Sequence, residues 1–162
     1  MRTPAAAMGT SAFFVVAPGG VAGVVPWLLT GWRVHHPLPG WTAFQVVGWV
    51  LLVAGAVVLV HAFVRFVVEG VGTPAPVAPA RRLVVGGLYR YVRNPIYLAL
   101  VAIIVGQALI FGRVVVLLYA AVLWIVFAAF VRLYEEPALR DRFGADYEAY
   151  CRAVPAWWPR RR

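Results

Sequence analysis

The chain has 162 residues, 63% of them hydrophobic, and its mean hydropathy is +0.82. A soluble domain of this length cannot bury so much apolar surface, so we expect one domain, residues 1–162, embedded in lipid. The net charge is +9, and every basic residue is an arginine. These arginines lie at the ends of apolar runs, which indicates membrane topology and argues against nucleic-acid binding. The single cysteine, Cys151, excludes an internal disulfide, and no metal site is predicted.

Four apolar segments are predicted to cross the membrane as helices. They cover about residues 11–30, 41–64, 95–111 and 114–131. Pro18 and Pro26 should kink the first helix. Only Gly112 and Arg113 separate the last two helices, which predicts a tight hairpin whose two free ends lie at the same membrane face. The predicted fold is therefore an all-α integral membrane protein with four transmembrane helices.

The polar segments between and after these helices are a motif loop, residues 65–94, and a tail, residues 135–162. In the loop, Arg65 and Glu69 are spaced as an i, i+4 ion pair, which we interpret as a self-compensating surface pair. Asn94 is predicted to be the N-cap of the helix that starts at Pro95. Pro137 is predicted to lie in the first turn of another helix. The tail is predicted to be an amphipathic interfacial segment, divided at Gly144 and anchored by Trp157 and Trp158.

The arginines orient this bundle. With four spans and the N-terminus inside, 13 arginines lie on the inner side and two on the outer side. The outer pair is Arg33 and Arg113. A bias of this size predicts that both termini are cytoplasmic and that the protein is integral to the cell (inner) membrane.

Two polar clusters should then meet at the cytoplasmic face. The first, residues 81–97, reads RRLVVGGLYRYVRNPIY, and the second contains Arg132, Glu135 and Glu136. Each member also has a local interpretation, since arginines and tyrosines mark interfaces and acids favour helix N-termini. Together, however, carboxylates, guanidinium groups and aromatic rings suit a ligand that is zwitterionic, cationic and aromatic. S-adenosylmethionine is such a ligand, although the residue chemistry alone does not name it.

The order of motifs resembles the isoprenylcysteine carboxyl methyltransferase family, and more loosely the membrane phospholipid methyltransferases. The matching pattern is LVxxGxYRYVRNPxY, a helical hairpin, and then EExxLRxxFGxxYxxYxxxVPxxxP, which covers about residues 73–159. The resemblance implies an integral membrane enzyme that transfers a methyl group from S-adenosylmethionine to a lipophilic acceptor.

The clusters and the resemblance together give a set of expected site residues. The cofactor is expected to contact Arg81, Arg82, Leu83, Val84, Tyr89, Arg93, Asn94, Tyr97, Glu135 and Glu136. The catalytic candidates are Arg132, near the family's substrate-facing arginine, and Glu135. The family's Arg-His-Pro is here Arg93-Asn94-Pro95, so a titratable group is absent at the second position.

The expected acceptor is a prenylcysteine-like carboxylate, a thiol or a lipid amine, methylated at the cytoplasmic face among membrane lipids. Two alternatives remain open at this stage. The first is an NADPH-dependent membrane reductase, in which the arginines would hold phosphates. The second is a non-catalytic four-helix membrane protein, in which both clusters are only topology signals.

Overall fold

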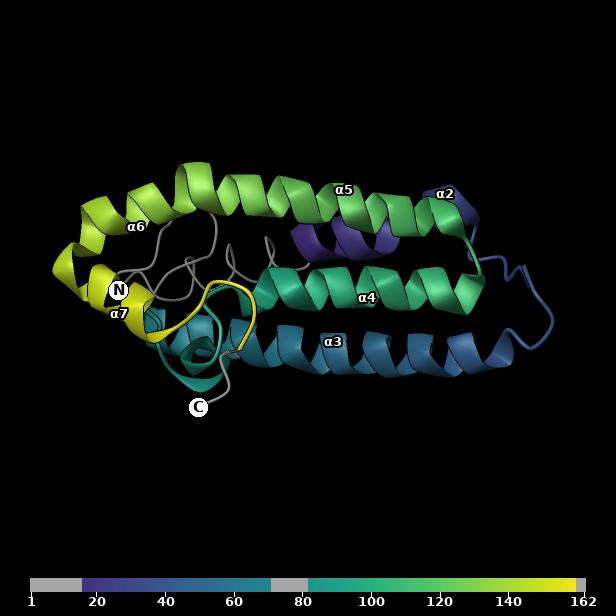
Figure 1. Ribbon diagram of the computed structural model, residues 1–162, viewed down its shortest axis with the longest axis horizontal. Helices are drawn as coiled ribbons and strands as arrows, with labels where there is room; N and C mark the ends of the chain where they lie inside the picture. The colour runs from purple at the N-terminus through teal and green to yellow at the C-terminus, as the bar shows by residue number, and fades with distance from the viewer. Residues whose placement is uncertain (1–15, 71–81, 160–162) are drawn as a thin grey trace.

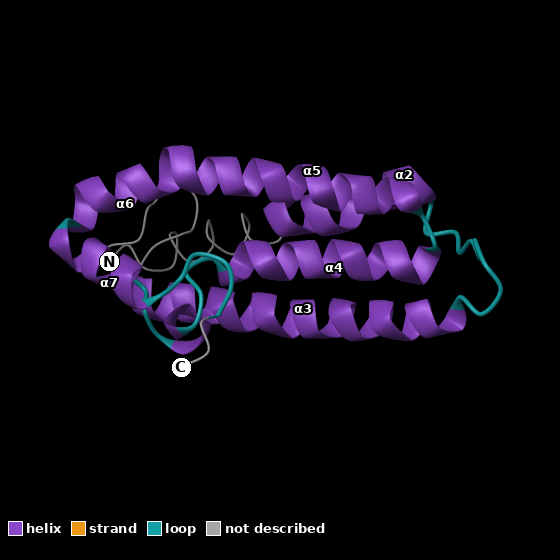
Figure 2. Cartoon of the chain, in the orientation of Figure 1, coloured by secondary structure: helices purple, strands orange, loops and turns teal. Residues whose placement is uncertain are grey.

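The computed structural model describes residues 16–70 and 82–159, and within these ranges the chain forms helices and no strand (Figure 2). Three long helices lie side by side, α3 (Thr42–Gly70), α4 (Pro95–Phe111) and α5 (Val114–Phe130), with α4 between the other two (Figure 1). The shorter elements are η1 (Gly20–Val24), α2 (Val25–Thr30), η2 (Gly87–Arg90), η3 (Val131–Glu135), α6 (Glu136–Phe143) and α7 (Ala145–Ala153). The all-α class is confirmed.

Two of the helical stretches are long and apolar enough to cross a membrane, namely residues Thr42–Arg65 and Val114–Phe143. The apolar helices Val16–Thr30 and Pro95–Phe111 are shorter. At 1.5 Å per residue, the 17 residues of α4 span about 26 Å, somewhat less than the bilayer's hydrocarbon core. Large apolar side chains remain exposed along α3, among them Val46, Val53 and Val57. The number of membrane crossings stays a prediction.

The first helix widens into a π-turn, η1, just before Pro26. Proline has no N–H, so the Ala22 carbonyl, four residues earlier, lacks its α-helical donor. In the π-turn the Val25 N–H donates to Gly20, and the Val21 carbonyl, five residues before the proline, lacks its donor as well. Side chains from two other helices replace it. Gln107 Nε2 donates to the Ala22 carbonyl, and Tyr119 Oη donates to that of Val21 at 2.8 Å. The polar groups of Gln107 and Tyr119 inside this apolar bundle therefore replace donors that the helix lacks before Pro26.

The C-terminal end of α4 is capped by the loop before α3 and by the first turn of α3. A helix leaves its last four carbonyls without intrahelical donors. Here the carbonyl of Phe111 accepts from the His35 amide at 2.9 Å, that of Ile110 from Gln45 Nε2 at 3.0 Å, and that of Leu109 from Trp41 Nε1 at 2.8 Å. Trp41 thus fixes the start of α3 against the end of α4.

Small residues allow α3 and α4 to pack backbone to backbone. A Cβ at Gly48 would lie 2.7 Å from the carbonyl oxygen of Gly106, and one at Gly55 would lie 2.9 Å from that of Ala99. Close approach through glycine is a common way for helices to associate in lipid, where the hydrophobic effect does not drive them together.

The chain does not break between α5 and α6, where the apolar run was expected to end. It passes through a second π-turn, η3, and α6 then begins with Pro137 in its first turn, as predicted. Both π-turns end two residues before a proline. Because a proline ring clashes with the carbonyl of the preceding turn, local widening lets the helix continue past it. The predicted division at Gly144 is confirmed, with φ at 52°.

Candidate functional site

The two polar clusters lie at the same end of the bundle, as the hairpin predicted. Residue Tyr97 is in the first turn of α4 and Glu135 is the last residue of η3, 38 positions later. The Tyr97 hydroxyl donates to Glu135 Oε2 at 2.9 Å. The ring of Phe127, about two helical turns before Glu135, packs on Tyr97 with ring centroids 4.9 Å apart. The hairpin α4–α5 therefore builds a carboxylate–tyrosine pair.

Trp157 lies beside this pair, and Trp124 packs on Trp157. The ring of Trp157, from the tail, lies 6.5 Å from that of Tyr97 and 4.7 Å from that of Trp124 on α5. The sequence predicted an interfacial anchor at Trp157 and Trp158 and missed this contact. Trp158 is exposed, as an anchor would be, but Trp157 is not. We refer to Tyr97, Glu135, Trp124 and Trp157 as the carboxylate–aromatic niche.

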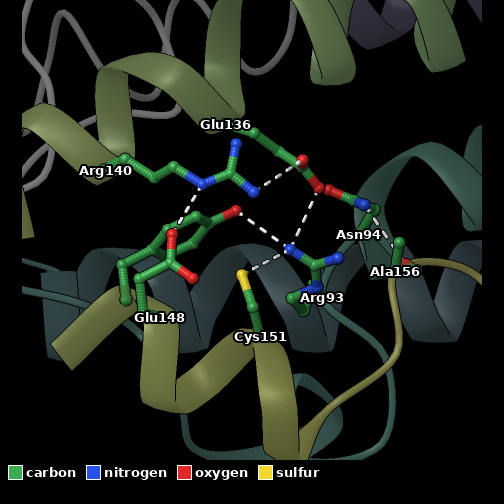
Figure 3. Close-up of polar contacts among 8 residues, drawn as sticks. Arg93, Asn94, Glu136, Arg140, Glu148, Cys151 and Ala156 are labelled. Atoms are coloured by element: carbon green, nitrogen blue, oxygen red, sulfur yellow. Dashed lines mark hydrogen bonds and ion pairs between the residues drawn. The ribbon is translucent and has the colours of Figure 1, made fainter. Parts of the chain in front are cut away.

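Arg93 forms the centre of a second polar group, shown in Figure 3. Its Nη1 lies 3.0 Å from Glu136 Oε1, and it donates to Tyr147 Oη at 3.1 Å and to Cys151 Sγ at 2.8 Å. Arg140 links to the same group through Glu136. Adjacent acids therefore have different partners, since Glu135 meets Tyr97 while Glu136 meets Arg93. Arg93 joins the motif loop to α6 and α7.

Asn94 occupies the N-cap position of α4, but its side chain makes no capping hydrogen bond, so the predicted capping role of this side chain is wrong. Instead Nδ2 donates to the carbonyl of Ala156 at 3.2 Å (Figure 3). The backbone N–H of Arg93 donates to the carbonyl of Pro155 at 3.0 Å. These two bonds hold the tail against the start of α4, directly before Trp157.

The remaining predicted site residues divide by burial. Val84 and Tyr89 are buried and pack with Ala62 of α3. Leu83 is half-buried, whereas Arg82 and Arg132 are exposed. Arg81 lies outside the described residues. Of these predicted residues, the structure therefore buries Val84 and Tyr89 and leaves Arg82 and Arg132 at the surface.

Burial and charge act together on Tyr89, which precedes the niche in the motif loop. Burial raises its pKa, and the negative charge of Glu135 raises it further. Both effects disfavour a tyrosinate at this position. Burial likewise raises the pKa of Tyr150, whose hydroxyl donates to the Tyr89 carbonyl at 2.7 Å.

Within the described ranges, no group of three or more His, Cys, Asp or Glu residues could hold a metal ion.

A bundle of apolar helices with one polar, aromatic end is typical of helical membrane proteins. A family model described as phospholipid methyltransferase matches residues 43–146, from the start of α3 to the start of α7. That is more than half of the chain, and the chain belongs to the phospholipid methyltransferase family. Together with the long apolar helices, this identifies a membrane protein.

The chain is also similar to protein-S-isoprenylcysteine O-methyltransferase of Schizosaccharomyces pombe. The two are 37% identical over 78 residues, which are 48% of this chain and 33% of the relative. The aligned part is thus about a third of the relative's length. No solved structure matches the chain. The resemblance inferred from the motifs is confirmed by both matches.

Proposed function

We propose that the protein is a membrane methyltransferase that transfers a methyl group from S-adenosylmethionine to a lipophilic acceptor. The observation that carries the proposal is the carboxylate–aromatic niche, in which Tyr97 donates to Glu135 at 2.9 Å beside Trp157. Glu135 is the residue that we assign to the cofactor and to catalysis. Family membership supports the reaction class.

The chemistry of the niche fits S-adenosylmethionine. A carboxylate has about four acceptor positions, so Glu135 retains acceptor capacity beyond the bond from Tyr97 and suits hydroxyl or amino donors of the cofactor. Aromatic faces such as those of Tyr97 and Trp157 attract a cation. Tyr89 is buried close enough to Glu135 for the carboxylate charge to raise its pKa, and we expect it to contact the cofactor from that side of the site.

When bound, S-adenosylmethionine supplies a methyl group that is already activated on a sulfonium. The protein's own contribution is therefore alignment and exclusion of water. Trp157 brings the tail onto Tyr97 and onto Trp124 of α5, and the bonds from Arg93 and Asn94 hold that tail in place. On this basis we assign Arg93, Asn94 and Glu136 to the ordering of the site rather than to direct cofactor contact.

The acceptor that the chain suits best is an anionic one. Asn94 stands where the resembled family has histidine and offers no titratable group. A carboxylate acceptor needs no general base, whereas an amine would have to lose a proton. The relative is by name an isoprenylcysteine O-methyltransferase, while the family model is named for phospholipids. We favour a prenylcysteine-like carboxylate, with a thiol or lipid amine as the alternatives, and place exposed Arg132 on the acceptor side.

Ligand binding to the purified protein in detergent tests the reaction class. We expect S-adenosylmethionine and its demethylated product to bind and NADPH not to bind; saturable NADPH binding alone would support the reductase, and no binding of either would support a non-catalytic protein. Transfer of labelled methyl to a panel of a prenylcysteine, a lipid thiol and an amine phospholipid then identifies the acceptor. Label that enters only the amine phospholipid would overturn the carboxylate assignment.

A further inference from the structure

Glu69, near the end of α3, lies outside both polar clusters, and its carboxylate has two partners. Oε1 forms the predicted ion pair with Arg65, with Nη1 at 3.0 Å. Oε2 accepts from the backbone N–H of Gly86 at 3.0 Å, 17 residues along the chain. The ion pair is exposed, and pairs of this kind contribute little. The bond to Gly86 is charge-assisted and partly buried, which makes it the more consequential contact.

The two glycines of the motif loop are fitted against this face of α3. A Cβ at Gly86 would overlap the Glu69 carboxylate. A Cβ at Gly87 would lie 2.9 Å from His61 Nε2, and φ at Gly87 is +56°, a conformation that other residues rarely adopt. Because both residues lack side chains, the turn approaches α3 without displacing the side chains of Glu69 and His61.

The turn determines where Tyr89 lies. The Gly86 carbonyl accepts from the Tyr89 amide at 3.1 Å, and Gly87 begins the 3-10 turn η2 that buries Tyr89 against Ala62. Gly86 thus links the two: its N–H donates to the Glu69 carboxylate, and its carbonyl accepts from the Tyr89 backbone. The negative charge of Glu69 is also among those that raise the pKa of Tyr89.

We propose that Glu69 is a positioning residue of the methyltransferase site, which holds the Gly86–Gly87 turn so that Tyr89 is presented to the cofactor. The inference rests on the proposed function. Glu69 acts only through Gly86 and Tyr89 and touches no reacting group. The sequence indicated a self-compensating pair of Arg65 and Glu69. On this proposal the main role of Glu69 lies in Oε2, which faces Gly86 and not Arg65.

Three variants in detergent separate the two contacts of Glu69. Glu69→Leu removes both, Arg65→Gln removes only the ion pair, and Glu69→Gln keeps an amide oxygen that can accept from Gly86. Hydrogen exchange over residues 84–91 without ligand reports the turn, and the Kd for S-adenosylmethionine reports its consequence. We expect Glu69→Leu to exchange faster and to bind about tenfold more weakly, with kcat at saturation within about threefold of wild type. Arg65→Gln should match wild type, and Glu69→Gln should stay within about threefold.

A Glu69→Leu protein with wild-type exchange and wild-type Kd would overturn the inference, as would an equal loss in Arg65→Gln. If Glu69→Leu does not fold, Gly86→Ala displaces the carboxylate from the other side and should give the same faster exchange and weaker binding. If the wild-type protein binds no S-adenosylmethionine, the proposed function fails. The exchange measurement still decides in that case whether Glu69 holds the turn.

Discussion

The adjacent acids Glu135 and Glu136 have different roles because consecutive residues of a helix point in different directions. Glu135 projects toward α4 and accepts from Tyr97, while Glu136 projects toward Arg93 and Arg140. The first carboxylate is next to aromatic rings in the niche, and the second is part of an ion-pair network that orders the tail. We therefore expect only the first to receive a ligand's donors.

Replacing Glu135 by glutamine tests this difference. A charged hydrogen bond contributes about 1.5–3 kcal/mol, so Glu135→Gln should bind S-adenosylmethionine about tenfold or more weakly while folding normally. If the acid only complements the start of α6, the change costs at most about 1 kcal/mol of stability and leaves the Kd unchanged. Titration calorimetry measures the Kd, and a thermal melt measures the fold. Glu148→Gln, which removes an exposed carboxylate paired with Arg140, is the control.

Asn94 gives a second prediction at the scale of one residue. Its amide donates to the Ala156 carbonyl and so fixes the residue before Trp157. Asn94→His retains an N–H donor and should keep the Kd and turnover within several-fold. Asn94→Leu and Asn94→Asp cannot donate, and both should weaken cofactor binding about tenfold by loosening the tail.

Binding and pH–rate profiles of the three Asn94 variants measure this effect. If Asn94→His instead raised turnover by orders of magnitude, with a new pH dependence near about 6.5, the residue would be a lost general base and not a tether. Wild-type binding by Asn94→Leu would exclude the tether.

At the scale of the helices, prolines and glycines made most boundaries predictable. Pro95 and Gly112 bound α4 as expected, and Gly144 divides α6 from α7. The π-turns before Pro26 and Pro137 were not predicted, because a proline inside an apolar run is compatible with a kink, a break or a widened turn. Which of these forms depends on whether another helix supplies donors, and that is a property of the packed bundle.

The donors of Gln107 and Tyr119 therefore provide a test on Pro26. Gln107→Leu leaves the Ala22 carbonyl without its donor and should cost about 1 kcal/mol, the scale of such bonds between helices in lipid. In a Pro26→Ala background the helix regains its own N–H, and Gln107→Leu should then be close to neutral. Reversible unfolding of the four proteins in mixed micelles gives the cycle. An equal cost in both backgrounds would mean that Gln107 acts by packing alone.

At the scale of the whole molecule, the sequence predicted that both polar clusters share one end, because a two-residue turn leaves a hairpin no other geometry. The pairing of Tyr97 with Glu135 follows from that hairpin. The return of the tail to the niche does not follow from the hairpin. Trp157 and Trp158 are both typical of interfacial anchors, and their order does not indicate which one faces inward. Likewise, the spacing of Glu69 indicated its pair with Arg65 but not its bond to Gly86.

The placement of this end in the cell is the last prediction. The arginine bias of 13 to two predicts that the niche lies at the cytoplasmic face, with four crossings and both termini inside.

Single cysteines at exposed, uncharged positions test this orientation without changing the arginine bias. They are introduced in a Cys151→Ser background, which keeps a polar partner for Arg93. We expect Leu38→Cys to react with an impermeant maleimide added to intact cells, and Val85→Cys and Ala138→Cys to react only after the membrane is opened. Labelling of Val85→Cys in intact cells with protection of Leu38→Cys would invert the orientation. Labelling of all three from outside would mean that α3 does not cross, and that the niche lies on the outer surface.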